Sequence, residues 1–169
     1  MTTTQRHAAA AGLVLALAGV PGWEPAAAVQ GGGPQTAPDM CALLTQEEAG
    51  AVLGSPVAAP LKGATGTCTY AMESGMGDIM IHNLPLTFAS EKEFHAYLVQ
   101  ETEKTNARIK KKLGDAFKPM TVDPAPEVGQ PAYYVDPQLV VLKDGRVLGI
   151  VAADRKQAVA VAAKAVPRF

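Results

Sequence analysis

The sequence predicts an α+β domain, with an antiparallel sheet of about five strands and helices packed mainly on one face. Two hairpin patterns and three capped helical patterns follow one another without the regular strand–helix alternation of a parallel sheet. The expected order is helix, two strands, helix, an optional short strand, three strands and a final helix. Hairpins dominate this order, which favours antiparallel pairing.

The first predicted helix is about two turns long and follows Thr45. Residues 45–48 (TQEE) form a capping box, in which Thr45 is the N-cap and Glu48 reaches back to it. Gly54 suits a left-handed C-terminal position, and Pro56 prevents continuation. The apolar face holds Ala49, Val52 and Leu53.

The first hairpin is predicted over residues 67–84. Residues 67–72 (TCTYAM) are rich in residues that favour strands. A glycine-bearing turn over 73–78 leads to a second strand over 79–84, so we expect a hairpin with a longer loop.

The second predicted helix begins at another capping box, SEKE over 90–93. It is expected over 91–105, and a continuation or a new start over 109–113 stays open. In the second predicted helix, over 91–105, the apolar side is marked by Phe94, Tyr97 and Leu98, which have helical spacing.

Four prolines in the stretch 118–131 predict an irregular connection after this helix, with a short edge strand as an option.

The second half of the chain predicts a strand over 132–135, then a hairpin of strands 138–143 and 146–152. Asp144-Gly145 between them is the strongest short hairpin signal in the chain. A two-residue turn there pairs Leu142 with Val147 and Val140 with Gly149.

The final predicted helix starts at Asp154 and ends before Pro167. Its small side chains allow a close approach to a sheet. They are Ala158, Val161, Ala162 and Ala165.

Residues 1–28 are typical of a signal peptide, with an apolar run over 8–20 and small residues at 26–28. The run is shorter than the roughly 20 residues of a membrane span, although a retained anchor helix stays an alternative. Residues 29–39 predict a flexible linker, and residues 40–169 a single domain. We therefore expect an exported protein, periplasmic or extracellular.

The near balance of 15 Lys and Arg against 16 Asp and Glu argues against a nucleic-acid partner. The chain also lacks a G-x-S-x-G nucleophile motif, a phosphate-binding loop and an H-E-x-x-H motif. These observations predict a protein that is not an enzyme and uses no cofactor.

Cys41 and Cys68 are the two cysteines of the chain. In an exported protein, two cysteines more often pair than stay free. Their disulfide would join the start of the first helix to the strand over 67–72. On loop-closure entropy it is worth roughly 3–4 kcal/mol. Two buried thiols are the alternative. A redox or metal site is disfavoured, because it would require a C-x-x-C motif or a nearby histidine, and the chain has neither.

Three stretches carry a family resemblance: CALLT over 41–45, CTY over 68–70, and VGQPAYY over 128–134 followed by the hairpin over 139–151. Together they resemble a family of small exported bacterial domains of unknown function, many of which are lipoproteins. The likeness covers nearly all of residues 40–166. It implies the Cys41–Cys68 disulfide and an α+β fold, and it brings no catalytic residues. This chain lacks the lipid-attachment cysteine.

A methionine and histidine cluster is the sharpest chemical signal in the chain. Thioether and imidazole groups suit Cu(I), which makes a metal-handling protein the second hypothesis for function. The alternative is that Met80 fills the core and Met76 lies in an exposed turn. The cluster consists of Met72, Met76, Met80 and His82.

A basic cluster follows the second capping box. It could meet an anionic envelope surface, such as phospholipid headgroups or a cell-wall polymer. The alternative is a solvated helix end. The cluster consists of Lys104, Arg108, Lys110, Lys111, Lys112 and Lys118.

The strands over 139–142 and 147–151 are apolar at successive positions, so both faces of the sheet need cover. If the helices cover one face, the other would form a homodimer interface or bind an apolar small molecule or a protein. Cover by the proline-rich stretch 118–131 is the alternative. The leading hypothesis is an exported, non-enzymatic binding module that uses one sheet face.

Overall fold

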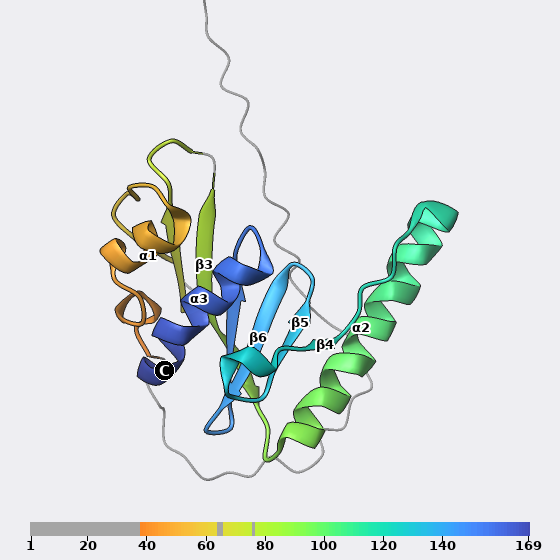
Figure 1. The fold of residues 1–169 in the computed structure, drawn as a ribbon. Coiled ribbons are helices and arrows are strands. Elements are labelled where there is room, and N and C mark those ends of the chain that lie inside the picture. The colour runs from red at the N-terminus through yellow and green to blue at the C-terminus, as the bar shows by residue number, and fades with distance from the viewer. Residues whose placement is uncertain (1–37, 64–65, 76) are drawn as a thin grey trace, which may run out of the picture. The chain divides into compact units, whose positions relative to one another are not determined.

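The computed structural model describes residues 38–63, 66–75 and 77–169, which form an α+β unit around one antiparallel sheet (Figure 1). The predicted signal peptide (1–28) and residues 29–37 of the predicted linker lie outside the described residues. Asp39, assigned to the linker by sequence, instead caps a single 3-10 turn, η1 (Met40–Ala42), by accepting the N–H of Cys41.

The sheet has seven strands within the described residues, in the order β1-β2-β3-β7-β6-β5-β4. The expectation of about five strands is therefore wrong. The strand missed by the sequence is β1, whose three residues are exposed, while β4 is the optional short edge strand. The strands are β1 (Leu61–Gly63), β2 (Thr67–Ala71), β3 (Asp78–Thr87), β4 (Asp123–Pro124), β5 (Ala132–Val135), β6 (Gln138–Lys143) and β7 (Arg146–Val151).

The predicted helix starts are confirmed by three side-chain caps. Thr45, Ser90 and Asp154 each accept the backbone N–H of the residue three positions later. Gly54 ends the first helix with a φ of 71°, which favours glycine. The second helix is continuous to its end. The helices are α1 (Gln46–Leu53), α2 (Glu91–Leu113) and α3 (Arg155–Ala165).

The β6–β7 hairpin has the predicted register, with Leu142 opposite Val147 and Val140 opposite Gly149. Side chains alternate between the two faces of a strand, so each strand contributes to two cores. One core contains Leu139, Val141, Leu148 and Ile150. The other contains Val140, Leu142 and Val147.

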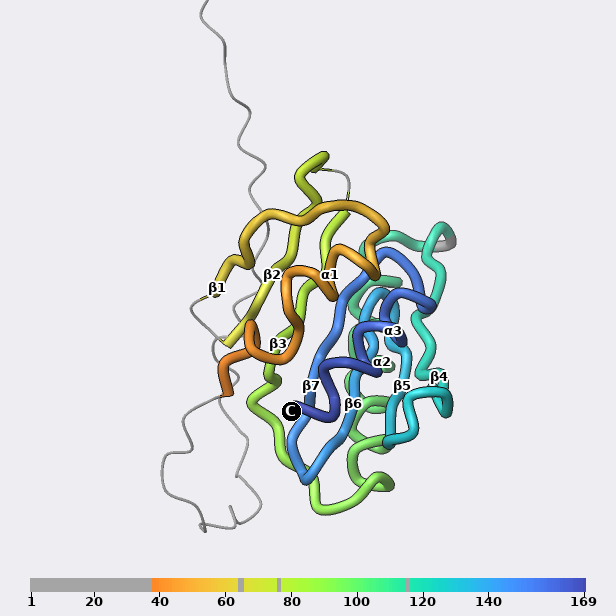
Figure 2. Tube along the Cα trace, turned by 60° about the vertical axis from the view of Figure 1, so that its left-hand side comes forward, coloured from red at the N-terminus to blue at the C-terminus, as the bar shows by residue number. Residues whose placement is uncertain are grey.

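The helices divide between these two faces. The first face, named the closed face below, packs against η1, α1 and α3. The second face packs against Phe94 and Leu98 of α2. In Figure 2, α3 crosses in front of the strands and α2 lies behind them. The expectation that the helices pack mainly on one face is not confirmed, because α2, the longest helix, packs against the second face.

Candidate functional site

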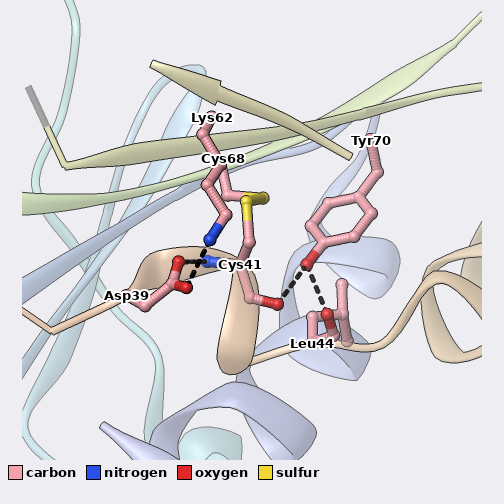
Figure 3. The surroundings of a disulfide bond; sticks show 6 residues. All are labelled: Asp39, Cys41, Leu44, Lys62, Cys68 and Tyr70. Carbon is pink, nitrogen blue, oxygen red and sulfur yellow. Dashed lines mark hydrogen bonds and ion pairs between the residues drawn. A yellow bond between two sulfur atoms is a disulfide. The ribbon is translucent and has the colours of Figure 1, made fainter. Parts of the chain in front are cut away.

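The predicted pairing of Cys41 with Cys68 is confirmed, and the disulfide joins η1 to β2 on the closed face (Figure 3). The two Cα atoms are 5.1 Å apart. The hydroxyl of buried Tyr70 donates to the carbonyls of Cys41 and Leu44. Burial is the main reason that the pKa of Tyr70 is raised to about 12. These contacts fix the entry to α1, so this region has a structural role.

Among the described residues, α2 covers only part of the width of the second face. The core beneath α2 uses residues of β5, β6 and β7. Further along, strand pairing places one row of side chains side by side across five strands, and a second row beside it across three. We name this surface the open face. Its residues are Leu61, Thr69, Met80, Val151 and Gln138 in the first row and Thr67, His82 and Gly149 in the second.

Solvent reaches the open face even at the centre of the sheet. Met80 and His82 lie on β3 and Val151 on β7, and each of these strands has a neighbour on both sides. All three side chains are nevertheless only half-buried, and Leu61 on edge strand β1 is 66% exposed. A helix packed above them would bury them, as α2 buries Val147. No described helix therefore covers the open face.

A histidine–glutamine pair spans the open face. The side-chain nitrogen of Gln138 on β6 lies 2.6 Å from Nε2 of His82 on β3. The pair crosses over Gly149 on the intervening strand β7, where a Cβ atom would overlap both nitrogens. Burial lowers the pKa of His82, which favours the neutral imidazole that accepts the amide N–H.

The sequence did not identify Gln138 or its contact with His82. The available signal was Gly149, a glycine inside an otherwise apolar strand, which often marks a close approach of other groups. Its partners could not be named, because they depend on how β3 pairs with β7. That pairing joins two hairpins that are distant in sequence.

The predicted metal-binding residues are only partly brought together. Met80 and His82 lie on the open face, two positions apart on β3. Met72 packs against the core of the closed face, and Met76 lies outside the described residues. Within the part of the chain that the structure describes, no three His, Cys, Asp or Glu side chains are arranged to hold a metal ion.

The predicted basic cluster lies on the distal half of α2 and just after it. Its side chains are exposed, and Lys104 pairs with Glu101 at 2.7 Å. The structure brings five of these cations together on α2, and Lys118 follows five residues after the last residue of the helix.

Several surface pockets, lined by described residues, lie away from the predicted site residues. One of about 660 Å³ lies beside α1 and is lined by Gln46, Glu47, Gly50, Gly54, Ser55, Pro56, Val57 and Glu73. Another of about 300 Å³ lies where the proline-rich stretch meets the start of α2. There the hydroxyl of Tyr133 donates to Glu91 at 2.9 Å.

No known protein family, curated protein or solved structure matches the chain. The family resemblance of the three sequence stretches therefore stays a prediction. Among the described residues, no helix is long and apolar enough to cross a membrane.

Proposed function

We propose that this protein is an exported, non-enzymatic binding module whose open face contacts a protein partner. The observation that supports this most directly is the incomplete burial of Met80, His82 and Val151 at the centre of the sheet. Central strands normally have both faces covered when their side chains are apolar, so an accessible apolar centre is a candidate interaction surface.

The composition of the open face favours a protein over a small molecule. Apolar side chains lie among hydroxyl, imidazole and amide groups, as in protein interfaces, which combine apolar contact with hydrogen bonds. Methionine adapts its shape to a partner. The sheet also holds these groups on rigid strands, which reduces the entropy lost on binding. The apolar members are Leu61, Met80 and Val151, and the polar members are Thr67, Thr69, His82 and Gln138.

Two features support export. The N-terminal segment has the pattern of a signal peptide, and the Cys41–Cys68 disulfide is of the kind that persists in oxidising compartments. A partner outside the cytoplasm follows from this proposal.

A photo-cross-linking residue in place of Thr69, introduced in the cells that make the protein, tests the open face. The control carries the same residue in place of Ala163, an exposed position on α3. We expect a discrete cross-linked protein from position 69 only, and its loss when Met80→Glu is added. Equal labelling from both positions would contradict the proposal.

Native mass spectrometry of the purified protein separates the other occupants. A mass of two chains that reverts to one in Met80→Glu would identify a homodimer as the partner. A co-purified apolar molecule that is lost in the same variant would identify a ligand-binding module instead.

A metal-handling protein is the second candidate, because Met80 and His82 share one face of β3. One sulfur and one nitrogen ligand fit Cu(I) only if a partner or another residue completes the site. Titration with Cu(I) tests this. Stoichiometric uptake that disappears in both Met80→Ala and His82→Ala would favour metal handling over the binding module.

A further inference from the structure

The distal half of α2 carries a concentration of positive charge. Residues 104–118 contain six of the 15 Lys and Arg residues of the chain and one of its 16 Asp and Glu residues. This stretch therefore has a formal charge of +5, whereas the whole chain has a charge of −1. We name the exposed end of this stretch the basic tip. It consists of Arg108, Lys110, Lys111, Lys112, Leu113 and Lys118.

The basic tip projects beyond the core. The last buried residue of α2 is Thr102, and the helix continues to Leu113. At about 1.5 Å per residue, this is roughly 16 Å of helix beyond the core. Figure 1 shows this end of α2 standing apart from the sheet. Leu113 at the last position is 59% exposed, which is unusual for a large apolar side chain in this protein.

The geometry of the tip is held by the returning chain. The side-chain amide of Asn106 donates to the carbonyl of Met120 and accepts its N–H, both at 2.9 Å. The other end of α2 is fixed by buried Phe94 and Leu98. These contacts hold the part of α2 from which the tip projects, and four of the five cations of the tip lie on the helix.

The ion pairs between described residues do not involve the cations of the tip. None of the five forms an ion pair with a described residue, whereas Lys62, Arg155 and Arg168 pair with carboxylates at 2.6–2.7 Å. Cations in the last turn do complement the helix dipole, worth about 0.3–1 kcal/mol each. That effect does not account for the exposed Leu113 among them.

We propose that the basic tip docks on an anionic phospholipid bilayer. Lys110, Lys111, Lys112 and Leu113 make up one helical turn, so the lysines surround the leucine. Such a turn can place the leucine among the acyl chains while the lysines meet lipid phosphates. Each Lys near an anionic membrane surface contributes about 1 kcal/mol. A soluble polyanion would use the lysines but not the leucine, which is why a bilayer is favoured.

Sedimentation of the protein with vesicles tests this, using phosphatidylglycerol mixed with phosphatidylcholine and phosphatidylcholine alone. Replacing Lys110, Lys111 and Lys112 with Gln should weaken binding to anionic vesicles by about 100-fold, from about 1 kcal/mol per lysine. The matched control replaces Lys92, Lys156 and Lys164 with Gln, which changes the net charge equally and should weaken binding much less.

One further substitution distinguishes docking on a bilayer from attraction to a soluble polyanion. Leu113→Ser should weaken vesicle binding by about tenfold at unchanged charge, as expected for losing part of a leucine's burial. Raised salt should also weaken binding, because it screens the lysines. Met80→Glu on the open face should leave vesicle binding unchanged, so failure of this inference and failure of the proposed function are distinguishable.

Three results would overturn the inference. The first is equal loss of binding in both triple variants. The second is equal binding to neutral and anionic vesicles, which would point to an apolar part of the chain. The third is binding to soluble polyphosphate that is unaffected by Leu113→Ser, without binding to vesicles. Circular dichroism of each variant should match the wild type.

Discussion

The two faces of the sheet are built from the same strands but differ in what covers them. On β3, Ile81 points to the closed face and is fully buried, while its neighbour His82 points to the open face and is half-buried. Alternation along a strand decides which face a residue belongs to. The elements packed above that face then decide whether the residue stabilises the fold or remains available to a partner.

The closed face is also stabilised by a disulfide, and by an ion pair between two of the elements that cover it. On the open face, the corresponding contact is the hydrogen bond between His82 and Gln138. The Cys41–Cys68 disulfide links η1 to β2, and the two terminal guanidinium nitrogens of Arg168 donate to Glu48 at 2.7 and 2.8 Å. These hydrogen bonds, together with the Thr45 N–H, lower the pKa of Glu48 to about 2. We therefore expect stability to depend on the closed face and interactions on the open face.

Removing the disulfide should have the largest effect and tests the closed face directly. The double variant Cys41→Ser and Cys68→Ser opens a loop of 27 residues. On loop-closure entropy we expect a loss of about 3–4 kcal/mol in the free energy of unfolding. Urea denaturation measures this, and wild type treated with reductant should show a similar loss. An unchanged midpoint in both would contradict a structural role for the disulfide.

A pair of neighbouring substitutions on β3 compares the two faces most sharply. Ile81→Ala should lower the free energy of unfolding by about 3 kcal/mol, because it leaves a cavity in a closed core. Met80→Ala should cost about 1 kcal/mol, because part of that side chain is already in water. Urea denaturation of both variants gives the comparison. Equal costs would mean that the open face is covered in solution.

Much of the fold could be predicted because its signals are local. The capping residues Thr45, Ser90 and Asp154 lie within three residues of the groups they bind. The register of the β6–β7 hairpin follows from the two-residue turn at 144–145. The disulfide was predictable because the chain has two cysteines, which leave a single pairing, and because its N-terminal pattern predicts export.

The rest depends on contacts between distant segments. Strand β1 has three exposed residues, which give no periodic pattern. The amphipathic pattern of α2 predicts which side of the helix is apolar, but it does not predict which face of the sheet that side packs against. The contact between His82 and Gln138 requires β3 to pair with β7, and no local pattern specifies that pairing. The closed face was thus more predictable than the open face.

Gly149→Ala should have an intermediate effect and tests the histidine–glutamine pair. The new Cβ would overlap the side-chain nitrogens of His82 and Gln138, so both must move and their hydrogen bond is lost. We expect a loss of about 1 kcal/mol in the free energy of unfolding, which is the usual net contribution of one hydrogen bond to stability. In a His82→Ala background the same substitution should cost less, because one overlap has gone. An equal cost in both backgrounds would assign the effect to the backbone instead.

The smallest expected effect is a pH dependence that comes from the open face. Because burial lowers the pKa of His82 below its unfolded value of 6.5, the unfolded state binds more protons just below that pH. The stabilisation that neutral His82 adds to the free energy of unfolding should be fully present above pH 6.5. It should decline as the pH falls towards the lower pKa that His82 has in the folded protein. Protonation also leaves the imidazole without an acceptor for the amide of Gln138. Unfolding free energies of wild type and His82→Gln, measured against pH with His95→Gln as the control, should diverge only in this window. Parallel curves would mean that His82 is as solvated in the folded protein as in the unfolded chain.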